Sequence, residues 1–476
     1  MRRNISSSFE LRKDSSFVIP KMMKEQIRKS FGTDNITTTH SNQQDFGNEC
    51  TSVSPLLWMS LSDESLNGET SDPQRAALLP KEFGGSSLYK RLRSRSFPCW
   101  ILALIVFLIT MQATAVQASD SRQPSKTRIA KTQLVLHPFW QGQNMDREPA
   151  LFAVAPGAES ATARLLFVPT RIIRVTSGDG RITYDEGKDY LWTPGSDILT
   201  LTPSSRVPVK TWAQLYPPIG APQSLGEAVD GRSSVFFAEG GEVFQRLQVA
   251  ITYQHDSRWS GYVPNSAGMY LKRTIAKLQT KKAIKLVVLG DSISEGACAS
   301  STFGGPPYQS PYVGLVADGL REKYKDKVVV KNLSVGGNSS NWGASRASKV
   351  AAKNPDLVIL AFGMNDASGR ETSTVYDHNI REMMTTIRRK RPNVDFILVA
   401  TMMGNPEWSR SDTSLYMQYR DDLMRLSGPG VAVADLTSMW GDLLKSKKYV
   451  DLTGNGVNHP NDFGHRVYAE VILELL

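Results

Sequence analysis

The chain has 476 residues, which is long enough for two folded domains with additional processed or unfolded segments. Lysine and arginine outnumber aspartate and glutamate by 56 to 46, and the excess of +10 is spread along the chain. Because no segment of domain size is strongly basic, the charge argues against nucleic acid as a partner.

The first 96 residues are rich in Ser, Thr, Asn and Lys and show no sustained apolar period. A segment of this composition cannot bury enough apolar surface to fold, so we expect residues 1–96 to be disordered. The other interpretation is that they are a mis-assigned N-terminal extension, with the true start codon further downstream.

A secretory signal is expected at residues 97–118. The basic run 90–95 precedes the apolar residues 99–109, and the small residues of 115–118 follow. This order is typical of an exported protein, whether periplasmic, extracellular or on the cell surface. The alternative is a membrane anchor at residues 97–116, but the apolar stretch is shorter than the roughly 20 residues that span a bilayer. We expect membrane contact only through this segment.

The chain has three cysteines, Cys50, Cys99 and Cys298. Cleavage after Ala118 would leave Cys298 alone, so an intramolecular disulfide in the mature protein is excluded. We expect Cys298 to be a buried, unreactive thiol.

Residues 131–265 are expected to form a β-sandwich domain, jelly-roll-like in type. Short apolar or alternating runs rich in β-branched residues are separated by Gly and Pro turns, which is typical of an antiparallel all-β fold. The runs lie at residues 164–168, 171–175, 198–202, 233–237 and 247–253. This domain shows no catalytic cluster. It could bind carbohydrate or shape one wall of a site, or serve only as a packing module.

Residues 280–476 are expected to form an α/β domain. Five buried strands alternate with amphipathic helices, which predicts a parallel sheet covered on both faces. The strands are expected at residues 284–289, 328–333, 356–361, 396–400 and 431–434, and a last helix over 464–476. Functional residues of such sheets follow the carboxyl ends of the strands.

Three of these strand ends carry groups suited to ester chemistry. Ser292 follows the first strand in Gly-Asp-Ser, where a hydroxyl can meet a substrate. Gly337 follows the second strand and Asn365 the third. With the Ser292 amide, they could donate hydrogen bonds to the oxyanion of an attacked carbonyl. Each motif alone is more often structural.

A base for the serine is expected at His459. A serine hydroxyl is a weak nucleophile until a base takes its proton, and histidine has a suitable pKa. Of six histidines, His459 lies in a loop directly ahead of the last helix, followed by Pro460. His465 falls within that helix and is expected to be structural.

These four segments, in this order and each at the exit of an element, resemble the four blocks of the SGNH/GDSL hydrolase family over residues 284–476. The resemblance implies a three-layer, flavodoxin-like α/β/α domain. It also implies that Ser292 is the nucleophile and His459 the base, with Ser292, Gly337 and Asn365 forming the oxyanion hole. Asp291 would be a structural residue of the nucleophile turn.

One position departs from the family pattern. The family usually has Asp three residues before the catalytic histidine, and this chain has Gly456 there. The group that orients His459 therefore has to come from elsewhere. The candidates are Asp451, Asn455, Asn458 and Asp462. Alternatively a backbone carbonyl completes a Ser–His dyad, as is thought for similar two-domain carbohydrate esterases, and we favour the dyad.

The expected function is hydrolysis of an ester in a small molecule or polysaccharide through an acyl-enzyme, with no cofactor. By the same resemblance we expect an acetyl ester of a carbohydrate. The nearest alternative is a lipid esterase or lysophospholipase. An alternative from a different functional class is an exported glycan-binding protein whose site has lost catalytic activity.

Two further features have competing interpretations. His459, Asp462 and His465 have a spacing that could suggest metal ligands, but Pro460 interrupts any helix that would align them, so we expect no metal. The second feature is a set of aromatic residues that could stack on sugars but more often pack in cores. They are Trp342, Trp408 and Trp440.

Overall fold

The computed structural model describes residues 134–280, 282–325 and 327–476, which belong to one compact unit. The expectations for residues 1–96 and 97–118 lie outside the described residues. Within the described ranges, no helix has the length and apolar character needed to cross a bilayer.

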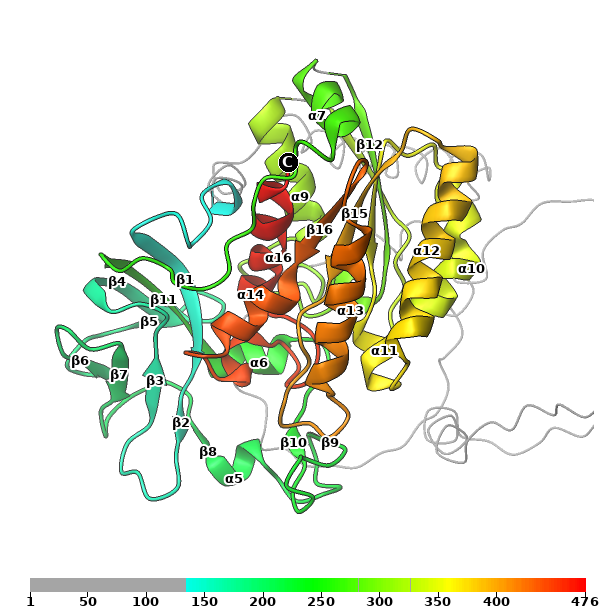
Figure 1. The fold of residues 1–476 in the computed structure, drawn as a ribbon. Coiled ribbons are helices and arrows are strands. Elements are labelled where there is room, and N and C mark those ends of the chain that lie inside the picture. The colour runs from blue at the N-terminus through cyan, green and yellow to red at the C-terminus, as the bar shows by residue number, and fades with distance from the viewer. Residues whose placement is uncertain (1–133, 281, 326) are drawn as a thin grey trace, which may run out of the picture. The chain divides into compact units, whose positions relative to one another are not determined.

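The expected parallel sheet is confirmed, with strand order β13-β12-β14-β15-β16 (Figure 1). All neighbouring pairs run parallel. The inner strands are almost wholly buried, as their continuous apolar sequences predict, whereas the edge strand β13 is partly exposed. The bounds are β12 Ile284–Gly290, β13 Val328–Asn332, β14 Leu357–Ala361, β15 Asp395–Ala400 and β16 Val431–Asp435.

Helices cover both faces of this sheet (Figure 1). On one side, α10 packs against α12, and on the other α9 packs against α16. The predicted last helix is confirmed as α16, which begins two residues earlier than residue 464. The bounds of these helices are α9 Tyr312–Tyr324, α10 Ser340–Ala351, α12 Ser373–Lys390 and α16 Asp462–Glu474. Also in this domain are α13 Thr413–Leu426 and α14 Leu436–Leu443.

The region before the parallel sheet is β-rich, as expected. One antiparallel sheet has the order β1-β11-β4-β5, and a second has the order β6-β7-β3-β2-β8. The second sheet is antiparallel except for its β2–β8 pair, which is parallel. A small pair, β9 (Ser224–Leu225) and β10 (Val235–Phe236), stands apart from both. The other bounds are β1 Asn144–Leu151, β2 Ala153–Val154, β3 Thr162–Arg164, β4 Pro169–Ser177, β5 Thr183–Tyr184, β6 Tyr190–Trp192, β7 Ile198–Leu201, β8 Lys210–Thr211 and β11 Gln248–His255.

One strand prediction was wrong. Of the strand predicted at residues 164–168, Arg164 belongs to β3, and residues 165–168 join β3 to β4 without forming a strand. The side chains of Leu165 and Phe167 are buried, which produces the apolar pattern. The backbone amides of Leu166 and Phe167 donate to the side chains of Glu148 and Tyr253 and not to the backbone carbonyls of a neighbouring strand. Burial therefore mimicked the pattern of a strand.

The two regions share one hydrophobic core. Buried side chains from Val135 to Leu476 form a continuous cluster that includes residues of both antiparallel and parallel sheets. The strand β1 contacts α15 (Tyr449–Leu452) and α16 at the junction. The β-rich region is thus packed directly onto the segment that carries His459.

Candidate active site

The nucleophile turn requires glycine at position 290. A Cβ on Gly290 would lie 2.5 Å from the carbonyl oxygen of Ala361 and 2.4 Å from Ser294 Oγ. Asp291 caps the short helix α8 (Ser292–Glu295) by accepting a hydrogen bond from the Ile293 amide at 3.0 Å. Burial raises the pKa of Asp291 to about 7. This turn presents Ser292 at the carboxyl end of β12.

The structure brings Ser292 and His459 together. Ser292 Oγ lies 2.8 Å from His459 Nε2, although the two residues are 167 positions apart. Both side chains are half-buried, so a substrate can reach them. Burial lowers the pKa of His459 to about 4, which keeps the imidazole neutral at pH 7. A neutral imidazole can accept a proton.

The second and third predicted segments meet beside Ser292. The Gly336 amide donates to Glu295 Oε2 at 2.7 Å, and a Cβ on Gly336 would lie 3.4 Å from Ser292 Cβ. Gly337, next in the chain, has a φ of 75° and open space where a Cβ would stand. The loop therefore runs close to Ser292 and can turn there because of its glycines.

Asn365 reaches the same loop from α11 (Met364–Ser368), which follows β14. Its Nδ2 donates to the carbonyl oxygen of Asn338 at 2.9 Å. A side-chain amide has two N–H donors, so one remains for a ligand. Asp366 fixes this corner by accepting from the amides of Ser340 and Gly363 at 3.0 and 3.1 Å.

The four candidates for orienting His459 occupy different environments. Asn455 lies against the imidazole, with Nδ2 3.0 Å from Nδ1, and Asn458 Oδ1 accepts from the same Nδ2 at 2.8 Å. Asp451 is buried and accepts from the backbone amides of Leu151 and Lys448. Asp462 Oδ1 accepts from the Ser300 amide at 2.8 Å.

Position 456 has no room for the carboxylate that the family pattern would place there. Gly456 has a φ of 95°, and a Cβ on it would lie 2.1 Å from the carbonyl oxygen of Phe236 and 3.0 Å from the ring of Phe244. The Asn405 side chain also donates to the Gly456 carbonyl at 2.8 Å. The missing aspartate is thus linked to the close packing of the β-rich region on this loop.

Cys298 is buried, as expected, and burial raises its pKa to about 12. Its Sγ lies 3.8 Å from His459 Nδ1, a contact that the sequence did not predict. His465 is fully buried, with Nε2 2.9 Å from the carbonyl oxygen of Ala297 and Nδ1 accepting from the Tyr312 amide at 3.4 Å. Its ring nitrogens are both engaged in the core.

The three tryptophans differ in exposure. Trp408 and Trp440 are buried, whereas Trp342 on α10 is half-buried. The Arg346 guanidinium stands 5.4 Å from the Trp342 ring, a cation–π contact. Within the described residues, no group of three or more His, Cys, Asp or Glu side chains could hold a metal ion.

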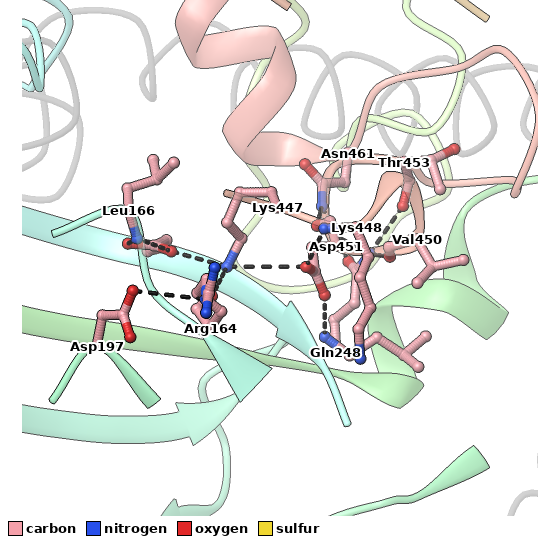
Figure 2. A network of polar contacts seen from close by, with 12 residues as sticks. Arg164, Leu166, Asp197, Gln248, Lys447, Lys448, Val450, Asp451, Thr453 and Asn461 are labelled. Atoms are coloured by element: carbon pink, nitrogen blue, oxygen red, sulfur yellow. Dashed lines mark hydrogen bonds and ion pairs between the residues drawn. The ribbon is translucent and has the colours of Figure 1, made fainter. Parts of the chain in front are cut away.

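A buried polar network joins the β-rich region to the segment before His459 (Figure 2). Lys447 Nζ lies 2.7 Å from Glu148 Oε1 and donates to the carbonyl oxygen of Arg164 at 2.7 Å. Gln248 Nε2, on β11, donates to the carbonyl oxygens of Val450 and Thr453, each at 2.8 Å (Figure 2). This network is not evident from the sequence, because Glu148 and Lys447 lie 299 positions apart.

Comparisons with known proteins agree with this arrangement. Residues 288–467 match the GDSL-like Lipase/Acylhydrolase family. An arylesterase from Vibrio mimicus is 31% identical over 111 residues, which cover 23% of this chain and 52% of the relative. The matched segment thus spans about half the length of that relative.

Solved structures that match part of this chain include two esterases. A two-domain esterase (CEX) active on acetylated mannans is 18% identical with a TM-score of 0.36, covering 45% of this chain and 54% of that one. Axe2, an acetylxylan esterase from Geobacillus stearothermophilus, is 19% identical with a TM-score of 0.32, covering 40% and 93%. The family match, the parallel sheet and the Ser292–His459 contact together identify residues 288–467 as a GDSL-like lipase/acylhydrolase domain.

Proposed function

We propose that the chain is a serine ester hydrolase with Ser292 as nucleophile and His459 as general base. The observation that carries the proposal is the 2.8 Å contact between Ser292 Oγ and His459 Nε2 at the carboxyl edge of the parallel sheet. A serine within hydrogen-bond distance of a neutral imidazole is the arrangement that nucleophilic acyl transfer needs.

In the first half-reaction, His459 Nε2 takes the proton of Ser292 as Oγ bonds to the carbonyl carbon of the ester. The oxyanion is held by the amides of Ser292 and Gly337 and by Asn365 Nδ2, and each such donor contributes about 3 to 4 kcal/mol. The tetrahedral intermediate then breaks its bond to the alcohol oxygen, which takes the proton from His459. An acyl-enzyme on Ser292 remains.

In the second half-reaction, water attacks the acyl carbon while His459 accepts its proton. The new tetrahedral intermediate releases the carboxylic acid, and the proton returns to Ser292 Oγ. This sequence uses side chains and amides of the chain alone, and no step calls for a cofactor.

We further propose that the substrate is an acetyl ester of a carbohydrate. The support is the polar surrounding of the nucleophile, where Glu295 is exposed and Asn338, Ser339 and Asn458 are half-buried. Hydroxyl-rich sugars find hydrogen-bond partners on such a surface, whereas a lipid chain would need an apolar one. Export through residues 97–118 is part of the same proposal, and the intact mass of the mature protein tests it.

A fluorophosphonate probe tests the mechanism. We expect it to label the wild-type protein and to leave Ser292→Ala unlabelled, while His459→Ala should lose most turnover with little change in KM. Labelling of Ser292→Ala, or near-normal turnover by His459→Ala, would contradict the assignment. Equal glycan binding by wild type and Ser292→Ala without any labelling would instead support a retired binding protein.

Hydrolysis rates then sort the substrate class. We expect para-nitrophenyl acetate and acetylated xylo- or manno-oligosaccharides to be cleaved in preference to long-chain acyl esters and lysophospholipids. A preference for long acyl chains would refute the carbohydrate proposal while leaving the acyl-transfer mechanism intact.

A further inference from the structure

The contacts of Asn455 fix the orientation of its side-chain amide. Its Oδ1 accepts from the backbone amides of Val457, Asn458 and His459 at 3.1, 3.0 and 3.0 Å. A backbone N–H is only a donor, so the atom that faces these groups must be the oxygen. The Nδ2 group therefore points the other way, to His459 Nδ1.

This orientation determines where the neutral imidazole carries its hydrogen. Nδ2 is a donor 3.0 Å from Nδ1, so Nδ1 must act as the acceptor and carry no hydrogen. The single hydrogen of the neutral ring then sits on Nε2, which faces Ser292 Oγ. In this tautomer the imidazole donates to the serine, whereas a general base must accept from it.

The tautomer that serves as a base needs an acceptor for a hydrogen on Nδ1. Among the described residues, the two hydrogen-bonding neighbours of Nδ1 are Asn455 Nδ2 and Cys298 Sγ, the latter at 3.8 Å. Sulfur is a weak acceptor, and burial keeps Cys298 in the thiol form by raising its pKa to about 12. The neutral ring therefore carries its hydrogen mainly on Nε2 at rest, and the tautomer that takes the serine proton in the proposed reaction, with hydrogen on Nδ1, is the minor one.

We propose that Asn455 is a positioning residue that occupies the place of the orienting carboxylate and holds His459 in the tautomer with hydrogen on Nε2. This inference rests on the proposed function, since it concerns the base of that reaction. The group that faces His459 Nδ1 then comes from position 455, four residues before the histidine. The family pattern has its carboxylate three residues before the histidine.

An aspartate at 455 would complete a triad without moving the backbone. Its Oδ1 would keep the three amide hydrogen bonds of the loop, and Oδ2 would replace the donor beside Nδ1 with an acceptor. Asn458 Oδ1 now accepts from Asn455 Nδ2, and rotating the Asn458 amide by half a turn would present its NH₂ group to the new carboxylate. Asn455→Asp is therefore a gain-of-function change on the present scaffold.

The tautomer is measured directly by ¹⁵N NMR of protein labelled at histidine, with His459→Ala used to assign the signals. We expect Nε2 of His459 to be protonated and Nδ1 unprotonated near pH 7 in the wild type, and the reverse in Asn455→Asp. A protonated Nδ1 in the wild type would overturn the proposal. This readout does not depend on esterase activity.

Kinetics provide the second arm. In serine proteases an amide in place of the orienting carboxylate lowers kcat about 10⁴-fold, so we expect Asn455→Asp to raise kcat by about 10- to 1,000-fold with little change in KM. The acid limb of its pH–rate profile should also move to higher pH, because the carboxylate favours the imidazolium. Asn393→Asp adds the same charge at an exposed residue just before β15, at the opposite edge of the sheet from Ser292, and we expect no comparable rise.

The arms separate the two proposals. A folded Asn455→Asp protein whose kcat does not rise, while wild type and variant both react with the fluorophosphonate, overturns the role of Asn455 and leaves the hydrolase. Absence of labelling in both proteins overturns the hydrolase itself, and the NMR result then still decides the tautomer.

Discussion

Replacing Lys447 with methionine should destabilise the protein by about 3 to 5 kcal/mol, because it removes one partner of a buried ion pair. The side chains of Lys447 and Glu148 have no exposed surface, and their charged atoms are 2.7 Å apart. After the substitution, the donors left to the Glu148 carboxylate among the described residues would be neutral, the Tyr253 hydroxyl at 2.6 Å and the Leu166 amide at 3.0 Å. Neither donor neutralises a buried charge.

The contributions of Lys447 and Glu148 to the free energy of unfolding should depend on each other. Lys447→Met with Glu148→Gln removes both charges, so the double variant should lose less free energy of unfolding than the sum of the two single variants. Urea titration of the four proteins gives the coupling energy, which we expect to exceed about 2 kcal/mol. Arg246→Ala is the matched surface control, because Arg246 and Glu242 form an exposed pair that should contribute less than about 1 kcal/mol. A loss below 1 kcal/mol for Lys447→Met would refute this reasoning.

Two further predictions concern the histidine loop. Gly456→Asp should fail to restore a triad. Both Gly456→Asp and Gly456→Ala should destabilise the fold by about 2 to 4 kcal/mol, because any Cβ at this position meets the Phe236 carbonyl. A faster Gly456→Asp esterase would contradict the packing argument. The kcat/KM of the wild type should stay level from pH 7 to about pH 5 and fall by half near pH 4, because burial lowers the pKa of His459 to about 4 and only the neutral ring accepts a proton. An acid limb near the ordinary histidine value of about 6.5 would show that the ring is more solvated than its surroundings imply.

The sequence was most informative for the strands whose burial determines their side-chain pattern. Each of the five predicted strands of the parallel sheet ends within two residues of its observed bounds, because strands buried on both faces must be apolar throughout. The placement of Ser292, Gly337 and Asn365 followed from the rule that parallel strands end at one edge. The order of the four segments pointed to His459 as the base, and in the structure its Nε2 lies 2.8 Å from Ser292 Oγ.

The sequence was least informative where charged residues are buried. The strand β1 contains Asp146, Arg147 and Glu148 and so lacks an apolar pattern, although most of it is inside the protein. Its Glu148 is neutralised by Lys447, some 300 residues away, which no local pattern can show. The sequence likewise left Asn455 as one of four candidates for orienting His459, because only the folded loop shows which polar side chain faces the ring.

The β-rich region is part of the active site's support. Gln248 of β11 holds the backbone of Val450 and Thr453, and the Ala238 amide donates to the carbonyl oxygen of Asn455 at 3.2 Å. The Phe236 carbonyl occupies the space in which a side chain at 456 would stand. The loop that orients His459 toward Ser292 is therefore held in part by contacts from the β-rich region, outside the α/β domain. Since the amides of that same loop turn the Asn455 oxygen away from the imidazole, the packing of the β-rich region sets not only where His459 lies but also which of its nitrogens carries the hydrogen.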